Sequence, residues 1–256
     1  MVLGTRQKAE LSRARLAIRR AYKHRLISLL ALEVFVIFAL APLIDLGVLP
    51  HTALGVTFTM ILVAGMLMLD LRSWTGRLLI LLGVTLIPVQ VWRYVRPGEL
   101  VLVIHPLGLI AFLLVLSWAL ASEVFRSERI KVDQVLGGVV LYLNIGLTFA
   151  LAYTLIENMV PGAFLLPPPL PSYPLHPAYF SYFSFVTLTT VGYGDITPVE
   201  AIARSLATLE AALGQLYPAI ILARLVSIEV SQRDQKLRSK HREQMPQDGG
   251  RAAGDR

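Results

Sequence analysis

The chain has 256 residues, of which 55% are hydrophobic and only 16% are charged, and its mean hydropathy is +0.62. This composition is too apolar for an ordinary soluble domain and is typical of a protein with several membrane-spanning helices. The chain contains no cysteine, which excludes disulfides and thiol chemistry, and its net charge of +7 does not by itself indicate nucleic-acid binding.

The first 25 residues are basic and amphipathic. They contain eight Lys or Arg residues, with Leu11, Ile18 and Tyr22 at helical spacing. Near a cytoplasmic leaflet each such cation contributes about 1 kcal/mol of attraction to anionic lipid. We therefore expect an interfacial helix that contacts anionic lipid rather than nucleic acid, with recognition of a protein partner as the alternative.

Six apolar runs follow, and each reaches about the 17 to 25 residues that a membrane-spanning helix needs. The runs are 26–44, 52–71, 78–95, 100–121, 135–156 and 202–226. We interpret the first run as a span rather than a cleaved signal peptide, because the basic segment before it is long and Pro42 would follow the cleavage site. The distribution of Lys and Arg then satisfies the positive-inside rule. The sequence predicts a multi-pass protein of the cell membrane with both termini in the cytoplasm.

The few ionisable residues of the first four runs are expected to have structural partners, because an unpaired charge in hydrocarbon costs several kcal/mol. The pairs expected from depth are Asp45 with Arg93 and Arg96, and Glu33 with Arg72 or Arg77. His105, in the fourth run, is expected to pack as a hydrogen-bonding residue between helices rather than to sense pH.

The connecting segments differ in character. Residues 122–134 mix charged and apolar residues, which predicts a linker helix along the inner membrane surface. The stretch from Glu157 to Pro177 contains seven prolines and no Lys or Arg, which predicts a stiff, extended outer loop. Residues 229–256 are short, polar and basic, and we expect a disordered tail with a helical start.

The most specific motif lies between the fifth and sixth runs. It reads Thr189-Thr190-Val191-Gly192-Tyr193-Gly194-Asp195, and a short helix is expected before it at 179–188. Two glycines two residues apart let the backbone alternate between ordinary and positive-φ conformations, so that successive carbonyl oxygens point to one side. Four such rows around an axis can replace the water around a potassium ion, with the Thr190 hydroxyl as a further oxygen.

This motif resembles the selectivity filter of the potassium channel family, and the similarity extends from about Val135 to about Val230. Pro198 and Arg204 stand at spacings where many family members carry a proline and a basic residue. The resemblance implies an all-α membrane protein with six transmembrane helices, a re-entrant pore helix and the tetrameric architecture of voltage-gated-like channels. It implies passive, potassium-selective conduction by a homotetramer without a cofactor. The residues implied to bind the permeant ion are Thr190, Val191, Gly192, Tyr193 and Gly194.

The resemblance divides the chain into five segments. They are the N-terminal segment 1–25, a four-helix bundle 26–121, the linker 122–134, a pore domain 135–228 and the tail 229–256. In six-helix members the first four helices form a voltage sensor, whose fourth helix carries several arginines. Residues 100–121 contain no Arg or Lys, so we expect no strong sensor-type voltage gating.

Four residues are expected to support the filter: Thr189, Asp195, Tyr182 and Glu210. Many members have a tryptophan where this chain has Tyr182, which is expected to donate to Asp195 instead. Glu210 is expected to point away from the axis and to bond Thr187 or Ser184 behind the pore helix. The alternative is an acid that faces the cavity and raises the local potassium concentration.

Gating residues are expected in the sixth run. Gly214 falls where the gating hinge of the family falls, and the alternative is a small residue that allows close helix packing. Pro218 supports a bend, because it removes a helical hydrogen bond. The residues aligned with the cavity and inner mouth are Gln215, Pro218, Leu222 and Val226. Leu222 and Val226 would form an apolar constriction that closes by dewetting.

Other functional classes have less support. An enzyme should show a cluster of catalytic polar groups, and a transporter should show repeats or interrupted helices, and the sequence shows neither. The alternatives left are a non-conducting regulatory membrane subunit and a weakly selective cation channel. The complete filter motif argues against both.

Overall fold

The computed structural model describes residues 22–40, 43–44, 46, 48–50, 52–68, 73–95, 98–126, 132–166 and 177–244. Several predictions lie outside these residues: most of the interfacial helix, the tail beyond residue 244, the middle of the proline-rich loop, and the ion pairs that involve Asp45, Arg72 and Arg96.

Helices make up nearly all of the described chain. Residues 22–35 form an α-helix that continues as the π-helix η1 (Val36–Leu40). The helices that follow are α3 (Thr52–Met68), α4 (Trp74–Val95), α5 (Glu99–Arg126), α6 (Val132–Met159), α7 (Pro177–Leu188) and α8 (Ala201–Gln244). Two short strands, β1 (Phe164–Leu165) and β2 (Thr197–Pro198), pair antiparallel. This confirms the all-helical class predicted from the sequence.

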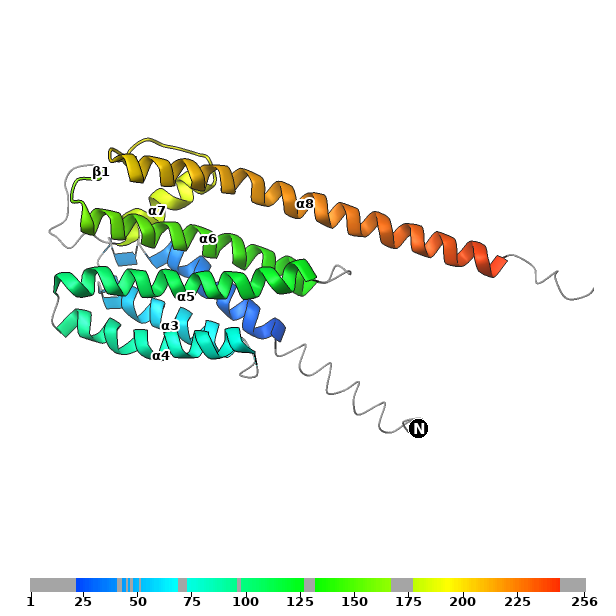
Figure 1. Ribbon diagram of the computed structural model, residues 1–256, viewed down its shortest axis with the longest axis horizontal. Coiled ribbons are helices and arrows are strands. Elements are labelled where there is room, and N and C mark those ends of the chain that lie inside the picture. The colour runs from blue at the N-terminus through cyan, green and yellow to red at the C-terminus, as the bar shows by residue number, and fades with distance from the viewer. Residues whose placement is uncertain are drawn as a thin grey trace, which may run out of the picture.

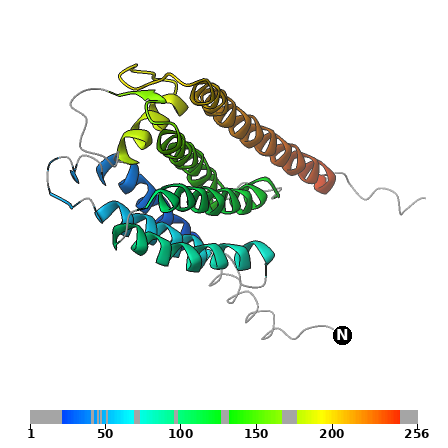
Figure 2. The same cartoon turned by 60° about the vertical axis from the view of Figure 1, so that its left-hand side comes forward.

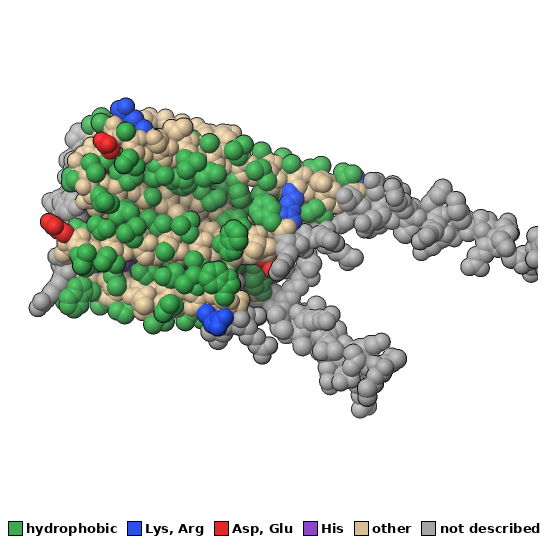
Figure 3. Space-filling model, in the orientation of Figure 1, with side chains coloured by type: hydrophobic (Ala, Val, Ile, Leu, Met, Phe, Trp, Pro, Cys, Tyr) green, Lys and Arg blue, Asp and Glu red, His purple; other side chains and the backbone are tan. Residues whose placement is uncertain are grey.

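Four of the described helices, α4, α5, α6 and α8, are long and apolar enough to cross a membrane. Helix α3 is apolar but has 17 residues, which corresponds to about 26 Å at the rise of an α-helix, slightly less than a typical hydrocarbon core. Figure 3 shows hydrophobic side chains across the middle of one face and charged side chains towards its two ends. This is the surface of a membrane protein.

The helices are arranged in two groups that meet at α6. Figure 1 and Figure 2 show α3, α4 and α5 on one side of α6, with α7 and α8 on the other. Helix α5 packs against α6 of the same chain, and α6 in turn packs against α7 and α8. The dark-blue start of the first described helix and the end of α8 lie at the opposite end of the bundle from β1 (Figure 1).

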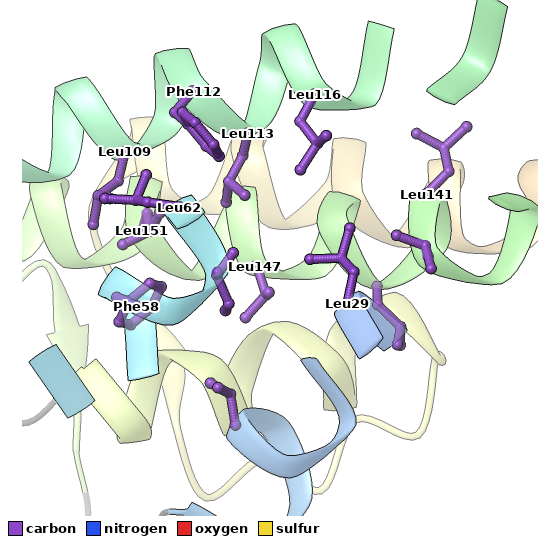
Figure 4. Packing of buried hydrophobic residues seen from close by; sticks show 14 of the residues in the cluster. Leu29, Phe58, Leu62, Leu109, Phe112, Leu113, Leu116, Leu141, Leu147 and Leu151 are labelled. Atoms are coloured by element: carbon purple, nitrogen blue, oxygen red, sulfur yellow. The ribbon is translucent and has the colours of Figure 1, made fainter. Parts of the chain in front are cut away.

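The core is a layer of leucine and phenylalanine side chains between these helices. Figure 4 shows Phe112 and Leu113 of α5 facing Leu62 of α3 and Leu147 of α6. Close approach depends on small residues: a Cβ on Gly65 of α3 would lie 2.8 Å from Cζ of Phe112. Glycine at such positions lets helices in a membrane protein pack by van der Waals contact.

The polar side chains of the bundle follow the sequence-based expectations only in part. Arg93 donates to Nδ1 of His105 at 3.4 Å, so the proton of that ring lies on Nε2, which contacts Oε1 of Gln90. His105 therefore packs between α4 and α5, as predicted.

Neither carboxylate oxygen of Glu33 has a hydrogen-bond partner, and the side chain of Arg77 is exposed. The predicted Glu33–Arg77 pair is wrong, because Glu33 faces the apolar core.

Two helices extend beyond the apolar runs. Helix α5 continues to Arg126, which takes in the first part of the predicted linker, and α8 continues to Gln244 through most of the predicted tail. The Gln, Lys, Arg and Glu residues of this extension are good helix formers, so the end of the apolar run does not end the helix.

Candidate functional site

The motif at 189–195 forms the loop between α7 and β2 and is held by the last turn of α7. The amide of Thr190 donates to the carbonyl of Thr187 at 2.9 Å. The amides of Val191 and Gly192 both donate to the carbonyl of Val186, at 2.9 and 3.3 Å. Three successive N–H groups of the loop therefore point towards the same helix.

This pattern fixes the direction of the carbonyl groups. In a trans peptide the N–H of one residue and the C=O of the residue before it point in opposite directions. The carbonyls of Thr189, Thr190 and Val191 consequently point away from α7. The φ angles of Thr190, Gly192 and Gly194 are 59°, 58° and 79°, so every second residue is left-handed. The alternation expected from the two glycines is present. It begins two residues before the first glycine, at Thr190.

A left-handed threonine is costly, by about 1 to 3 kcal/mol for a strained backbone residue. Neighbouring contacts offset this cost. Besides the bond from its own amide, Thr190 accepts a hydrogen bond at Oγ1 from Nε2 of Gln215, at 2.9 Å. Gln215 is thus placed beside the first residues of the loop, and its role as a cavity residue stays a prediction.

Tyr182 of α7 supports the second half of the loop. Its ring stacks on that of Tyr193, with centroids 6.4 Å apart and planes 4° from parallel. Its hydroxyl forms a hydrogen bond with Asp195, and the pKa of Tyr182 is raised, first by desolvation and then by this bond. The contact between Tyr182 and Asp195 is the one suggested by the sequence. Thr189 bonds back to the carbonyl of Phe185 through Oγ1, at 2.6 Å.

The chain beyond the loop is anchored to the segment after α6. The amides of Val199 and Glu200 donate to the carbonyl of Ala163, at 2.8 and 3.2 Å, and Nε of Arg204 donates to the carbonyl of Pro198 at 3.2 Å. Near the end of α6, the Glu157 carboxylate accepts hydrogen bonds from the amides of Gly162 and Phe164, at 2.8 and 3.1 Å, and so holds the turn that leads into β1.

The anchoring role of Glu157 was not predicted. In the sequence it only marks the start of the proline-rich stretch, and its partners are backbone amides, which leave no signature in residue types.

Two glycines let α7 pack closely between its neighbours. A Cβ on Gly146 of α6 would lie 2.6 Å from Cζ of Phe185, and a Cβ on Gly214 of α8 would collide with the carbonyl oxygen of Leu188. Helix α8 is a single α-helix through Gly214 and Pro218. Of the two readings of Gly214, close packing is the one seen in this structure.

Glu210 lies one turn before Gly214 and is fully buried behind α7. Its Oε1 contacts Oγ of Ser184 at 2.5 Å, and its Oε2 accepts from the hydroxyl of Tyr153 at 2.6 Å. This is the first of the two orientations considered from the sequence, with Ser184 as partner rather than Thr187. Tyr153 was missed, because it is far away in the chain and only the packing of α6 against α8 brings it close.

The residues proposed for the cavity and inner mouth are exposed in the single chain. They are Gln215, Pro218, Leu222 and Val226, and they recur along one face of α8. Leu222 is 62% exposed and Val226 is 55% exposed. Nothing within the described part of this chain covers these two side chains, so the apolar constriction stays a prediction.

Comparison with known proteins agrees with this geometry. Residues 176–230, which include α7, the loop and most of the apolar part of α8, match a protein family described as ion channel. The match confirms the family resemblance noted in the motif. No curated protein and no solved structure matches the chain.

Proposed function

We propose that this chain, whose residues 176–230 match the ion channel family, forms a potassium-selective channel that conducts passively through the loop 190–194. The observation that carries the proposal is the common direction of the loop carbonyls. Three successive amides are bound to α7, and left-handed residues alternate with ordinary ones. A row of hard oxygen ligands suits a hard cation, and carbonyl rows of this kind take the place of the hydration shell of K⁺.

Four copies are needed to complete the site. One loop supplies oxygens from one side and cannot encircle an ion, so we infer a homotetramer with one loop per subunit. Two observations support this assembly. Tyr193 is 71% exposed in the single chain, and the apolar face of α8 that carries Leu222 and Val226 is uncovered. In an assembly the face of α8 would surround the central axis. The Tyr193 ring, which stacks on Tyr182 of α7 on the side opposite to the loop carbonyls, would be covered by a neighbouring subunit.

The composition of helix α5 supports the proposal that the channel lacks strong voltage gating. Its charged residues, Glu99, Glu123 and Arg126, lie near its ends, and the residues between them contain no Lys or Arg. A sensor couples each elementary charge to the membrane potential by about 2.3 kcal/mol per 100 mV, and this helix carries no positive charge inside the membrane to be moved.

We further propose six spans in the cell membrane, with both termini in the cytoplasm and the loop near the outer surface. The ion channel match favours a non-enzymatic role.

The reversal potential tests selectivity directly. The purified protein is placed in a planar bilayer with K⁺ on one side and Na⁺ on the other, and we expect reversal far towards the K⁺ equilibrium potential. Gly192→Ala should abolish or strongly reduce K⁺ selectivity, because a Cβ is strained at this φ of 58°. Gly138→Ala is the matched control, since its Cβ would meet only the Tyr217 hydroxyl oxygen, at 3.6 Å.

Each contrary outcome has its own meaning. Reversal near zero with clear current would show a weakly selective cation channel. Absence of current under all voltages, in a protein that is folded and tetrameric, would favour a regulatory subunit.

A further inference from the structure

Three helices of the pore domain meet at one buried group of oxygens. Glu210 of α8, Ser184 of α7 and Tyr153 of α6 are each fully buried. The Ser184 hydroxyl oxygen lies 2.5 Å from Oε1 of Glu210 and 2.7 Å from the carbonyl oxygen of Gly146. The Tyr153 hydroxyl lies 2.6 Å from Oε2 of Glu210. The group therefore links the helix below the filter to both of its neighbours.

Counting the protons in these contacts leads to the protonation state. A serine hydroxyl carries one hydrogen, and a backbone carbonyl carries none. The hydrogen between Ser184 and Gly146 must come from Ser184. The shorter contact, between Ser184 and Glu210, then needs a second hydrogen, and only the carboxyl group of Glu210 can supply it. Tyr153 donates its own hydrogen to the other oxygen.

The surroundings of Glu210 offer no cation to balance a charge. Helix α7 has no Asp, Glu, Lys, Arg or His in its sequence, and the titratable groups of α6 that interact with Glu210 are the phenols of Tyr142 and Tyr153. On α8 the nearest cation before Glu210 in the chain is Arg204, which is bound to the carbonyl of Pro198. Within the part of the chain that the structure describes, Glu210 forms no ion pair. A buried carboxylate without a cation is strongly disfavoured.

We propose that Glu210 is a proton-binding site of the pore domain, and that its bound proton holds α7 against α6 and α8 and so keeps the filter in its conducting shape. Loss of the proton leaves one hydrogen for two contacts of Ser184, so one contact must break. Ser184 lies two residues before Val186, whose carbonyl holds the amides of Val191 and Gly192. Deprotonation therefore loosens the turn that aligns the loop carbonyls. The effect on conduction rests on the proposed channel function, whereas the bound proton does not.

The first experiment measures the pH profile of K⁺ current. The current of the wild type is recorded in symmetric K⁺ from about pH 6 to about pH 9, which stays about one unit below the ordinary pKa of a phenol. Each protein is normalised to its own value at neutral pH. We expect the wild-type current to fall as Glu210 loses its proton, by up to about tenfold per pH unit beyond the midpoint.

Glu210→Gln is the decisive variant, because its amide donates to Ser184 and accepts from Tyr153 without titrating. We expect it to abolish the alkaline fall. Glu33→Gln is the matched control, since it removes a buried carboxyl that has no hydrogen-bond partner, and it lies outside the pore domain. This control should keep the wild-type profile. A fall of equal size in Glu210→Gln, or a flat wild-type profile, would overturn the gating effect.

A second measurement separates the proton site from channel function. Infrared absorption reports the carbonyl stretch of a protonated carboxyl group at neutral pH and needs no current. We compare Glu33→Gln with the double variant Glu33→Gln, Glu210→Gln in membranes. The band should be present in the first and absent in the second. Equal spectra would show that Glu210 is ionised and would refute the proposal, even in a protein that proves not to conduct.

Discussion

At the scale of single residues, the hydrogen bond from Gln215 to Thr190 is the contact with the clearest consequence for the filter. It fixes the hydroxyl of a left-handed threonine at the inner end of the loop. Replacing Gln215 by Leu keeps the size of the side chain and removes the donor. We expect a lower preference for K⁺ over Na⁺ and a loss of about 1 kcal/mol of stability, the usual contribution of such a bond.

A double-mutant cycle tests that expectation. Thr190→Val removes the acceptor with little change of shape, so the bond is absent in either single variant and in the double variant. The effects of Gln215→Leu and Thr190→Val on the reversal potential in mixed K⁺ and Na⁺ should therefore be less than additive. Strict additivity would mean that Gln215 acts on the filter by another route.

How far the sequence predicts these contacts depends on how local they are. The filter motif is evident in the sequence because adjacent residues carry it, and the contact between Tyr182 and Asp195 was expected from the family resemblance. One of the two partners of Glu210 was expected: Ser184 lies in the short helix just before the motif, whereas Tyr153 is separated from Glu210 by the whole outer loop. The unpartnered state of Glu33 was not predictable, since depth along a helix does not tell which face a residue occupies.

At the scale of helices, the packing of α7 between two glycines leads to a graded prediction. In Gly214→Ala the new Cβ meets the backbone of Leu188, which cannot turn aside, whereas in Gly146→Ala it meets the ring of Phe185. Overpacking of this kind costs about 1 to 3 kcal/mol. We expect both variants to lower the thermal midpoint of the assembled protein, Gly214→Ala by more.

Gly138→Ala serves as the control, because it lies on α6 in ordinary contact and gains helix propensity. It should leave the midpoint unchanged or raise it. If Gly214→Ala altered gating without any loss of stability, the hinge reading of this residue would be correct and the packing reading would be wrong.

The existence of the helices was predictable and their ends were not. Apolar runs mark the part of a helix that lies in lipid, but a helix continues wherever its residues favour it, as α5 and α8 do beyond their apolar runs. The π-helix η1 in the first run has no counterpart in the apolar pattern, since that pattern does not distinguish one helical hydrogen-bond register from another.

In the proposed tetramer, the face of α8 that the single chain leaves uncovered surrounds the central axis. Val226 and Trp118 are both apolar and exposed, at 55% and 68%, on helices α8 and α5. In the proposed tetramer these two residues have different surroundings: Val226 of one subunit faces its copies around the axis, while Trp118 faces lipid. The chain has no cysteine, so a single introduced thiol reports on its own surroundings.

We therefore expect Val226→Cys to form disulfide-linked pairs of chains under mild oxidation in membranes, and Trp118→Cys to remain single, as judged on a non-reducing gel. The reason is geometric, because a disulfide needs Cα atoms within about 7 Å and only residues near a symmetry axis approach their own copies so closely. Linking through Trp118 alone would place the subunit contact on α5. That result would leave α8 facing lipid and would remove the basis for a central pore lined by this helix.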